Sequence, residues 1–373
     1  MIRIKIENGC KKDFPSDKRH VISPKPMKHK TRSVLGPAVL IAVGLVTAAT
    51  CGAQGSYHFL KEIPISGEGG WDYLSVDASA RRLYMSHGAE VVVVDIDADS
   101  VVGRITNTPG VHGLAPAPEL GRGFVSDGRE GKAAIVDLKT LQILSKVDTG
   151  QNPDGMVYEP GRQEAYMFNG RGRSATVIDA KSGKVVATIA LDGKPEFPAA
   201  DPAAGRVYDN IEDKSEVAVI DAATHSVVTN WPLAPGEEGS GLAIDAAHHR
   251  LFSGCHNNLM VMMDSTDGKV ITSVPIGNGV DACAFDDGTQ LAFSSCGDGT
   301  TTIAHEDAPD KLTVVQTLKT ARGARTMTLD PKTHRIYLPT AKFNPPAEGE
   351  RRPRMIPGTL RLLVYTMEPA PGQ

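Results

Sequence analysis

The sequence contains few of the residues that mark helical or disulfide-rich folds. Aromatic residues make up only 5% of its 373 positions, and long amphipathic helical periods are nearly absent. It has five cysteines without a C-x-x-C pair, and neither H-E-x-x-H nor G-x-S-x-G occurs, so the usual metalloprotease and nucleophile-elbow motifs are missing. What it does contain, 38 glycines and 25 prolines, favours short strands joined by tight turns and predicts an all-β protein.

The N-terminal segment departs from this pattern. A basic stretch, KPMKHKTRS, leads into the apolar residues 34–50 and then into the small residues Cys51-Gly52-Ala53. This succession is typical of a secretory signal cleaved after Ala53, which predicts a periplasmic or secreted protein. An uncleaved membrane anchor and a lipid-modified Cys51 are the alternatives. Met27 stands where a signal peptide would normally begin.

Excluding residues 1–53 changes the charge and the cysteine content of the chain. The remainder has 30 basic and 41 acidic residues, a formal net charge of −11. Binding to a phosphate backbone needs concentrated positive charge, so this balance argues against a nucleic-acid partner and favours cations or metals. Three cysteines remain, Cys255, Cys283 and Cys296. Two of them could form a disulfide in an exported protein, or all three could be unpaired and buried.

Comparison of the chain with itself reveals a repeat of 42 to 43 residues. Each copy contains a strand that ends in aspartate, a turn and a second strand, as in ATVIDAKSGKVVATI. The aspartates are Asp95, Asp137, Asp179, Asp221 and Asp264, and a degenerate sixth copy and a last copy at 360–365 follow them. A second hairpin lies between successive copies, so each period contains four strands, a to d.

A period of four strands and 40 to 45 residues is typical of a β-propeller blade. Counting the copies predicts a seven-bladed β-propeller formed by one domain, residues 54–373, which we expect to be a monomer. The last copy has strands a to c but no strand d. The segment 57–65, YHFLKEIPI, looks like a strand d without a blade before it, so we expect it to complete the C-terminal blade and close the ring.

The repeat motifs resemble those of a known family. D-x-x-T-G-x-V turns appear as DAKSGKV and DSTDGKV, and a P-D-G element appears as NPDG at 152–155. Over about residues 57–366 the chain resembles the YVTN-repeat or YncE-like propellers, which are related to the propeller domains of quinoprotein amine dehydrogenases. The resemblance implies the propeller fold and no single chemistry, because propellers include binding modules as well as enzymes.

The repeat also aligns the loops that join strand d of one blade to the inner strand a of the next. Each loop contributes one polar residue, which we expect to lie in a ring at one mouth of the central channel: Asp72, His112, Asp154, Glu196, Glu238, Asp281 and Arg325. Trp71 precedes the first of them. The loops between strands b and c open on the same face and add a second ring: His87, Asp127, Asn169, Asn210, His256, Asp298 and Lys342.

Turn geometry alone favours Asp, Gly and Pro, so a single Pro-Asp-Gly needs no ligand to explain it. The same loops, however, hold bulky or chemically distinctive residues such as Trp71, Tyr73, His112 and Phe197, which no turn requires. The turns at the opposite end, for example DPAAGR, are generic. We therefore predict a ligand or partner site at the acidic mouth, since ligand sites favour concave places where polar groups converge.

The sequence favours a binding protein for a small molecule, a cation or a protein partner. The alternatives are a metal-assisted, lactonase-like hydrolase, in which carboxylates hold a divalent cation such as Ca²⁺, and a protein-interaction scaffold. Asp154 and Glu196 are the candidate metal ligands. The segment 342–359, which carries three arginines, should emerge over the mouth as a lid or as a disordered loop.

Export predicts a shorter mature chain. The intact mass of the protein from its native host should correspond to a chain that begins after Ala53. A mature chain that keeps residues 27–50 would instead identify a membrane anchor.

Overall fold

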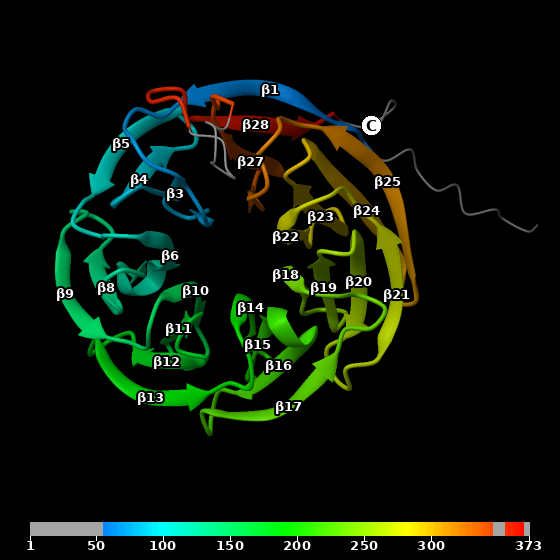
Figure 1. Ribbon diagram of the computed structural model, residues 1–373, viewed down its shortest axis with the longest axis horizontal. Helices are drawn as coiled ribbons and strands as arrows, with labels where there is room; N and C mark the ends of the chain where they lie inside the picture. Colours follow the sequence, from blue (N-terminus) through cyan, green and yellow to red (C-terminus); the bar gives the residue numbers. More distant parts are fainter. Residues whose placement is uncertain (1–54, 346–354, 369–373) are drawn as a thin grey trace, which may run out of the picture. The chain divides into compact units, whose positions relative to one another are not determined.

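The computed structural model describes residues 55–345 and 355–368, which form seven four-stranded antiparallel sheets arranged in a ring (Figure 1). This confirms the predicted seven-bladed β-propeller. The predicted signal segment, its cleavage site and residues 346–354 of the long loop lie outside the described residues. No helix in the described part of the chain is long and apolar enough to cross a membrane. Its only helical turns are η1 (Pro118–Leu120) and η2 (Glu212–Lys214).

Six blades take their strands from consecutive stretches of chain. Blades 1 to 3 consist of β2 (Leu74–Asp77), β3 (Arg82–His87), β4 (Glu90–Asp95) and β5 (Ser100–Ile105); β6 (Val111–Ala117), β7 (Arg122–Asp127), β8 (Lys132–Asp137) and β9 (Ile143–Asp148); and β10 (Pro153–Glu159), β11 (Glu164–Asn169), β12 (Ser174–Asp179) and β13 (Lys184–Ala190). Blades 4 to 6 consist of β14 (Pro195–Asp201), β15 (Arg206–Ile211), β16 (Glu216–Asp221) and β17 (Ser226–Pro232); β18 (Gly239–Asp245), β19 (Arg250–Cys255), β20 (Leu259–Asp264) and β21 (Val270–Pro275); and β22 (Val280–Asp286), β23 (Leu291–Cys296), β24 (Thr300–Ala308) and β25 (Lys311–Lys319). Blade 7 joins β26 (Thr328–Asp330), β27 (Arg335–Thr340) and β28 (Arg361–Met367) to β1 (Tyr57–Pro64).

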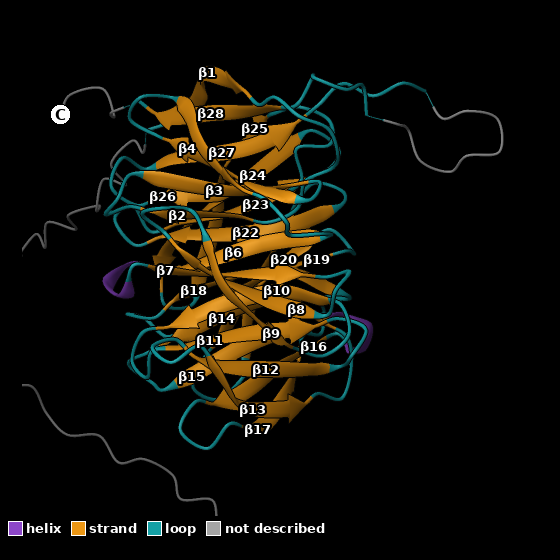
Figure 2. Ribbon diagram, turned by 90° about the vertical axis from the view of Figure 1, so that its left-hand side faces the viewer, coloured by secondary structure: helices purple, strands orange, loops and turns teal. Residues whose placement is uncertain are grey.

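The burial of each strand follows from its position in the ring. In β4, the run Val91–Val94 is at most 1% exposed, because the middle strands of a blade are covered on both faces by neighbouring blades. Such strands read as continuous β-branched runs. The outermost strand of each blade is only partly covered, as in β17, and these strands follow the perimeter of the ring (Figures 1 and 2).

The turns between strands a and b share one backbone geometry. In all seven, the residue four positions after the end of strand a has a positive φ, between 55° and 63°: Arg81, Gly121, Gln163, Gly205, His249, Gln290 and His334. Glycine adopts this left-handed conformation at no steric cost, while the other residues tolerate it in a tight turn. This common geometry fixes the register at that end of every blade.

The ring closes where β1 pairs antiparallel with β28, from Tyr57↔Met367 to Pro64↔Arg361, as the sequence predicts (Figure 1). Tyr57 also donates its hydroxyl to the His334 carbonyl at 2.6 Å. A second contact joins the ends of the ring, because the guanidinium of Arg81 in blade 1 binds both carboxylate oxygens of Asp330 in blade 7, at 2.9 and 2.8 Å. Bidentate pairs of this kind are geometrically specific.

The three described cysteines, Cys255, Cys283 and Cys296, are unpaired and buried in blades 5 and 6. Of the two arrangements that the sequence left open, the structure has the unpaired one. Burial raises the pKa of each thiol, to about 11 for Cys255 and about 12 for the other two, so these side chains act as small core residues.

The closing strand should dominate stability through its buried side chains. Replacing Ile63, which is 2% exposed in the core between blades 1 and 7, with alanine should lower the free energy of unfolding by roughly 3 kcal/mol. The matched control is Leu60→Ala in the same strand, at a side chain that is 38% exposed, and it should change stability by less than about 1 kcal/mol. Equal effects of the two substitutions in urea titrations would show that β1 does not hold the ring closed.

Candidate functional site

The polar ring at the channel mouth is built by equivalent positions of the inner strands. Counting back five residues from the end of strand a leads to one residue in each blade: Asp72, His112, Asp154, Glu196, Ser240, Asp281 and Arg325. Six of these are the residues that the sequence placed there. The structure thus brings together acidic and basic side chains that are more than 250 positions apart.

Glu238 is the exception in the predicted ring. The loop before β18 is two residues longer than the loops before β10, β14 and β22, so Ser240 takes the ring position. Glu238 lies two residues earlier, with its side chain 64% exposed. Glu238 faces His256 at 3.5 Å and does not enter the channel cluster. The even spacing of the other blades caused this wrong assignment.

The predicted second ring does not form as one set. His87, Asp127, Asn169 and Asn210 are fully buried in or at the ends of their b strands, where Asp127 pairs with Lys146 at 2.8 Å and the Asn210 amide donates to the carbonyls of Ser240 and Gly241. His256, Asp298 and Lys342 are exposed in the loops that follow. Asp298 accepts the backbone N–H groups of Asn278 and Thr300, which is a turn role.

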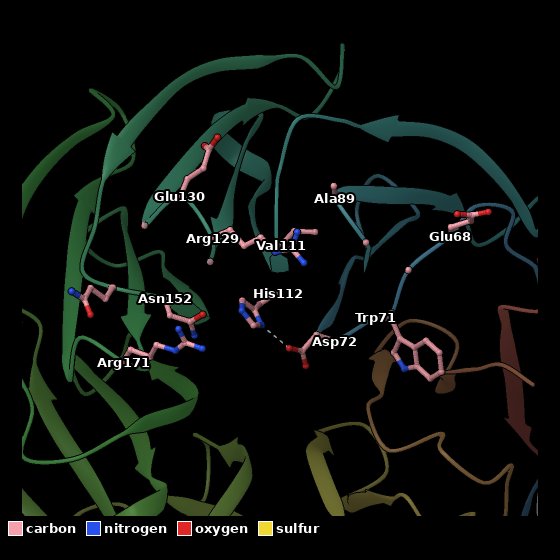
Figure 3. Close-up of a pocket in the computed structure, with 17 residues that line it drawn as sticks. Glu68, Trp71, Asp72, Ala89, Val111, His112, Arg129, Glu130, Asn152 and Arg171 are labelled. Carbon is pink, nitrogen blue, oxygen red and sulfur yellow. Dashed lines mark hydrogen bonds and ion pairs between the residues drawn. The ribbon is translucent and has the colours of Figure 1, made fainter. Parts of the chain in front are cut away.

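The mouth opens into a cavity of about 1110 Å³ above blades 1 to 3 (Figure 3). His112 lies at its centre, with its Nδ1 2.8 Å from Asp72 Oδ2 and 3.2 Å from Asp154 Oδ1. Trp71 lines one side and packs against Phe343. Arg129 and Arg171 are exposed on the rim. The cavity therefore has carboxylates at its bottom, and its edge carries two arginines together with Glu68 and Glu130.

Tyr73 and Phe197 form the floor beneath this cluster. Tyr73 extends from blade 1 and donates its hydroxyl to the Glu196 carbonyl in blade 4 at 2.5 Å, and its ring packs on Phe197 with 5.1 Å between centroids. Burial raises the pKa of Tyr73 well above its ordinary value, and the nearby carboxylates add to this effect, so the phenol remains neutral. A second cavity of about 450 Å³, mostly apolar, lies beyond Tyr73 and Phe197.

The carboxylates of the mouth are crowded and poorly hydrated. Burial raises the pKa of Asp154 to about 7, and the charges of Asp72 and Glu196 contribute to the same shift. Burial opposes the charged form of His112, but its hydrogen bond with Asp72 and the field of Asp154 outweigh that cost and raise its pKa. A proton or another cation therefore has a strong tendency to remain among these three side chains.

The opposite side of the mouth already has basic partners. Lys194 lies 2.7 Å from Glu196, and Arg325 lies 3.2 Å from Asp281. Burial still raises the pKa of Asp281 to about 7, and that of Glu196 is raised for the same reason. Glu196 and Asp281 thus have basic partners of their own, although the charge of Glu196 still acts on Asp154.

Asp209, in β15, is a member of the cluster that the sequence analysis did not include. It is fully buried, and neither carboxylate oxygen has a hydrogen-bond partner among the described residues. Burial raises its pKa well above the ordinary range, and Glu196 and Asp154 raise it further. The equivalent positions in other blades carry Met85, Val125, Met167, Ser253, Ser294 and Leu338, so a carboxylate in the middle of this strand was the signal that could have identified it.

The donor atoms of Asp72, His112 and Asp154 all lie within 4.8 Å of one another, which is the geometry of a group that could hold a metal ion. Of the two candidate ligands expected from the sequence, Asp154 belongs to this group. Glu196 does not, because it is paired with Lys194.

Comparison with known proteins supports the fold and no more. The sequence matches no protein-family profile and no curated protein. Among solved structures, the chain is similar to one described as hydrazine synthase from Kuenenia stuttgartiensis, with a TM-score of 0.65 and 15% identity over 75% of this chain and 96% of that one. At this identity the similarity concerns the propeller architecture.

The raised pKa values predict how stability depends on pH. Folded Asp154 and Asp281, with pKa values of about 7, retain protons that the unfolded chain has lost, so metal-free protein should lose stability as pH rises from about 4 to about 7. His112 acts in the same direction, since its raised pKa gives stability at low pH that is lost on deprotonation.

Replacing Asp154 with asparagine should reduce the slope of this decrease in stability with rising pH. In urea titrations with a chelator present, the variant should be more stable than wild type by on the order of 1 kcal/mol at pH 8 and about equal to it at pH 4. Glu238→Gln, an exposed acid beside the same mouth, is the control and should leave the slope unchanged. Parallel pH profiles for wild type and Asp154→Asn would contradict this account of the cluster.

Proposed function

We propose that this protein is a binding protein that holds a divalent cation at the mouth of its channel. The observation that carries the proposal is the convergence of Asp72, His112 and Asp154 from three adjacent blades, with their donor atoms within 4.8 Å of one another. No single blade forms this arrangement. It stands at the base of a cavity wide enough to admit a small ligand.

The donor set indicates which cations fit. One imidazole nitrogen with two carboxylates suits Mn²⁺ or Zn²⁺ better than Ca²⁺, which prefers oxygen ligands alone. Three protein ligands leave coordination positions directed to the cavity. Because Arg129 and Arg171 lie on the rim, we infer that the ligand carries an anionic group that binds the cation and reaches toward these arginines.

A metal-assisted hydrolase is the second candidate function. It is favoured by the coordination positions that Asp72, His112 and Asp154 would leave directed to the cavity. In that case the three side chains would hold the cation, and the cation would polarise a carbonyl and activate a bound water. Hydrolysis of lactones or esters by the metal-loaded protein would be the evidence for it.

Two further properties are proposed from the sequence. The basic, apolar and small-residue succession before residue 54 supports export to the periplasm or the exterior. The D-x-x-T-G-x-V-like turns support a place among the YVTN-repeat or YncE-like propellers. Both agree with a binding role outside the cytoplasm.

Titration calorimetry tests the cation site. Chelator-treated wild type should bind Mn²⁺ or Zn²⁺ at the mouth more tightly at pH 8 than at pH 5.5, because the ligands must lose protons. Asp72→Asn and Asp154→Asn should each weaken this binding at least about tenfold, equivalent to about 1.4 kcal/mol. Glu238→Gln should bind as wild type does. Binding that is absent, or equal in all four proteins, would remove the proposal and leave a protein-interaction scaffold as the remaining function.

A further inference from the structure

A second group of metal-binding side chains lies at the end of the propeller opposite the mouth, where blade 5 meets blade 6. Asp245 ends β18, His248 follows in the turn to β19, and Glu306 lies in β24. Their donor atoms also lie within 4.8 Å of one another. His248 Nδ1 is 2.6 Å from Asp245 Oδ2, so the histidine is not simply solvated as its position in a turn would suggest.

Glu306 differs in residue type from the residues at the equivalent position of other blades. Leu291, the first residue of β23, pairs with His305, and Glu306 follows His305. The N–H of Glu306 donates to the Gln290 carbonyl at 3.0 Å. The residues that make the same bond elsewhere are small or apolar: Ile96, Leu138, Ala180, Ala222 and Ser265. Five blades thus have no charge at this position, and blade 6 has a glutamate that is only 8% exposed.

The surroundings of Glu306 do not neutralise its charge. Its Oε2 is buried and has no hydrogen-bond partner among the described residues. Arg250 approaches Oε1 only to 3.8 Å, and that guanidinium is already bound to Asp264 and to the carbonyls of His249 and Pro309. The nearest acid, Asp245, carries the same charge. A buried carboxylate in this position is costly unless a cation or a proton joins it.

At the two following junctions of the ring, the next blade places a basic side chain against the equivalent aspartate, which the next blade does not do here. Asp286, the equivalent of Asp245 in blade 6, lies 2.7 Å from His334 Nδ1 of blade 7. Asp330 of blade 7 binds Arg81 of blade 1. His334 and Arg81 occupy the left-handed position of their turns, and at the junction of blades 5 and 6 that position is Gln290, which is neutral.

We propose that Asp245, His248 and Glu306 bind a divalent cation of the Zn²⁺ or Mn²⁺ class that joins blade 5 to blade 6. One imidazole nitrogen and two carboxylate oxygens form the donor set, and the ion takes the place of the proton between His248 and Asp245. Because the side chain of His248 is 53% exposed, the remaining coordination positions face solvent.

The chief alternative occupant is a proton. Burial and the charge of Asp245 raise the pKa of Glu306 to about 7, so near neutral pH the two carboxyls can share one proton when no metal is present. A cation that binds here displaces that proton. Binding should therefore release protons, which calorimetry detects as a dependence of the heat on the buffer.

Titration of Zn²⁺ and Mn²⁺ into tag-free, chelator-treated protein tests the site. The titrated parent protein is the variant Asp154→Asn, which has lost one of the three metal ligands at the mouth. Metal binding measured in this variant therefore reports on the second site. It should bind one equivalent of at least one of the two ions. Adding Glu306→Gln or His248→Asn should weaken that binding at least tenfold, whereas His249→Asn, at the exposed neighbouring histidine, should leave it unchanged.

Thermal melting checks that the variants are folded. Without metal, Glu306→Gln should melt at the same temperature as its parent or higher, because it removes a buried charge. Zn²⁺ should raise the melting temperature of the parent and not that of Glu306→Gln. Absence of binding in the Asp154→Asn parent would identify a proton-sharing pair, and unchanged binding in Glu306→Gln would place the ion elsewhere; either result overturns the proposal.

Discussion

The ladder between β1 and β28 is the interaction on which the rest of this propeller depends. It brings the first described strand of the chain to the last, so that blade 7 has four strands like the other six blades and β28 is paired on both sides. Every blade then has a neighbour on both faces. That requirement explains the buried, apolar middle strands and the partly exposed outer strands. It also fixes the spacing of seven inner strands around one channel.

The chemistry of the mouth is a consequence of this closure. Each inner strand contributes one side chain at the same height, so a ring of polar residues must share a narrow and poorly hydrated space. Lys194 and Arg325 balance two of the carboxylates. Asp72, Asp154 and Asp209 lack such a lysine or arginine partner among the described residues, and His112 contacts the first two. Tyr73 and Phe197 close the floor, which limits water from below and strengthens the interactions among these charges.

The repeat predicted the fold and most of the mouth because both depend on periodicity. A spacing of 42 residues was sufficient to place Asp72, His112, Asp154 and Asp281 at equivalent heights. It failed at Glu238, since two extra loop residues before β18 shift the register without changing the pattern on either side. The sequence could not predict which neighbouring side chains form ion pairs. The pair of Lys194 with Glu196, for example, depends on the direction of both side chains in three dimensions.

The periodicity of the sequence could not identify functional residues that depart from the repeat. Asp209 and Glu306 each stand where other blades have apolar or small residues, and both are buried carboxylates without a hydrogen-bond partner on at least one oxygen. Their identity was visible in the sequence, but their burial was not. Natural proteins keep such costly groups where function or specificity requires them, so these two positions indicate the two places at which this ring differs from a plain scaffold.

Anomalous diffraction from crystals grown with Mn²⁺ tests the central claim most directly. The account predicts an anomalous peak at the channel mouth within about 2.0–2.3 Å of Asp72, His112 and Asp154, with further positions of the ion facing the cavity. Well-ordered crystals at neutral pH in which these three side chains keep their mutual hydrogen bonds and no anomalous peak appears at the mouth would contradict it.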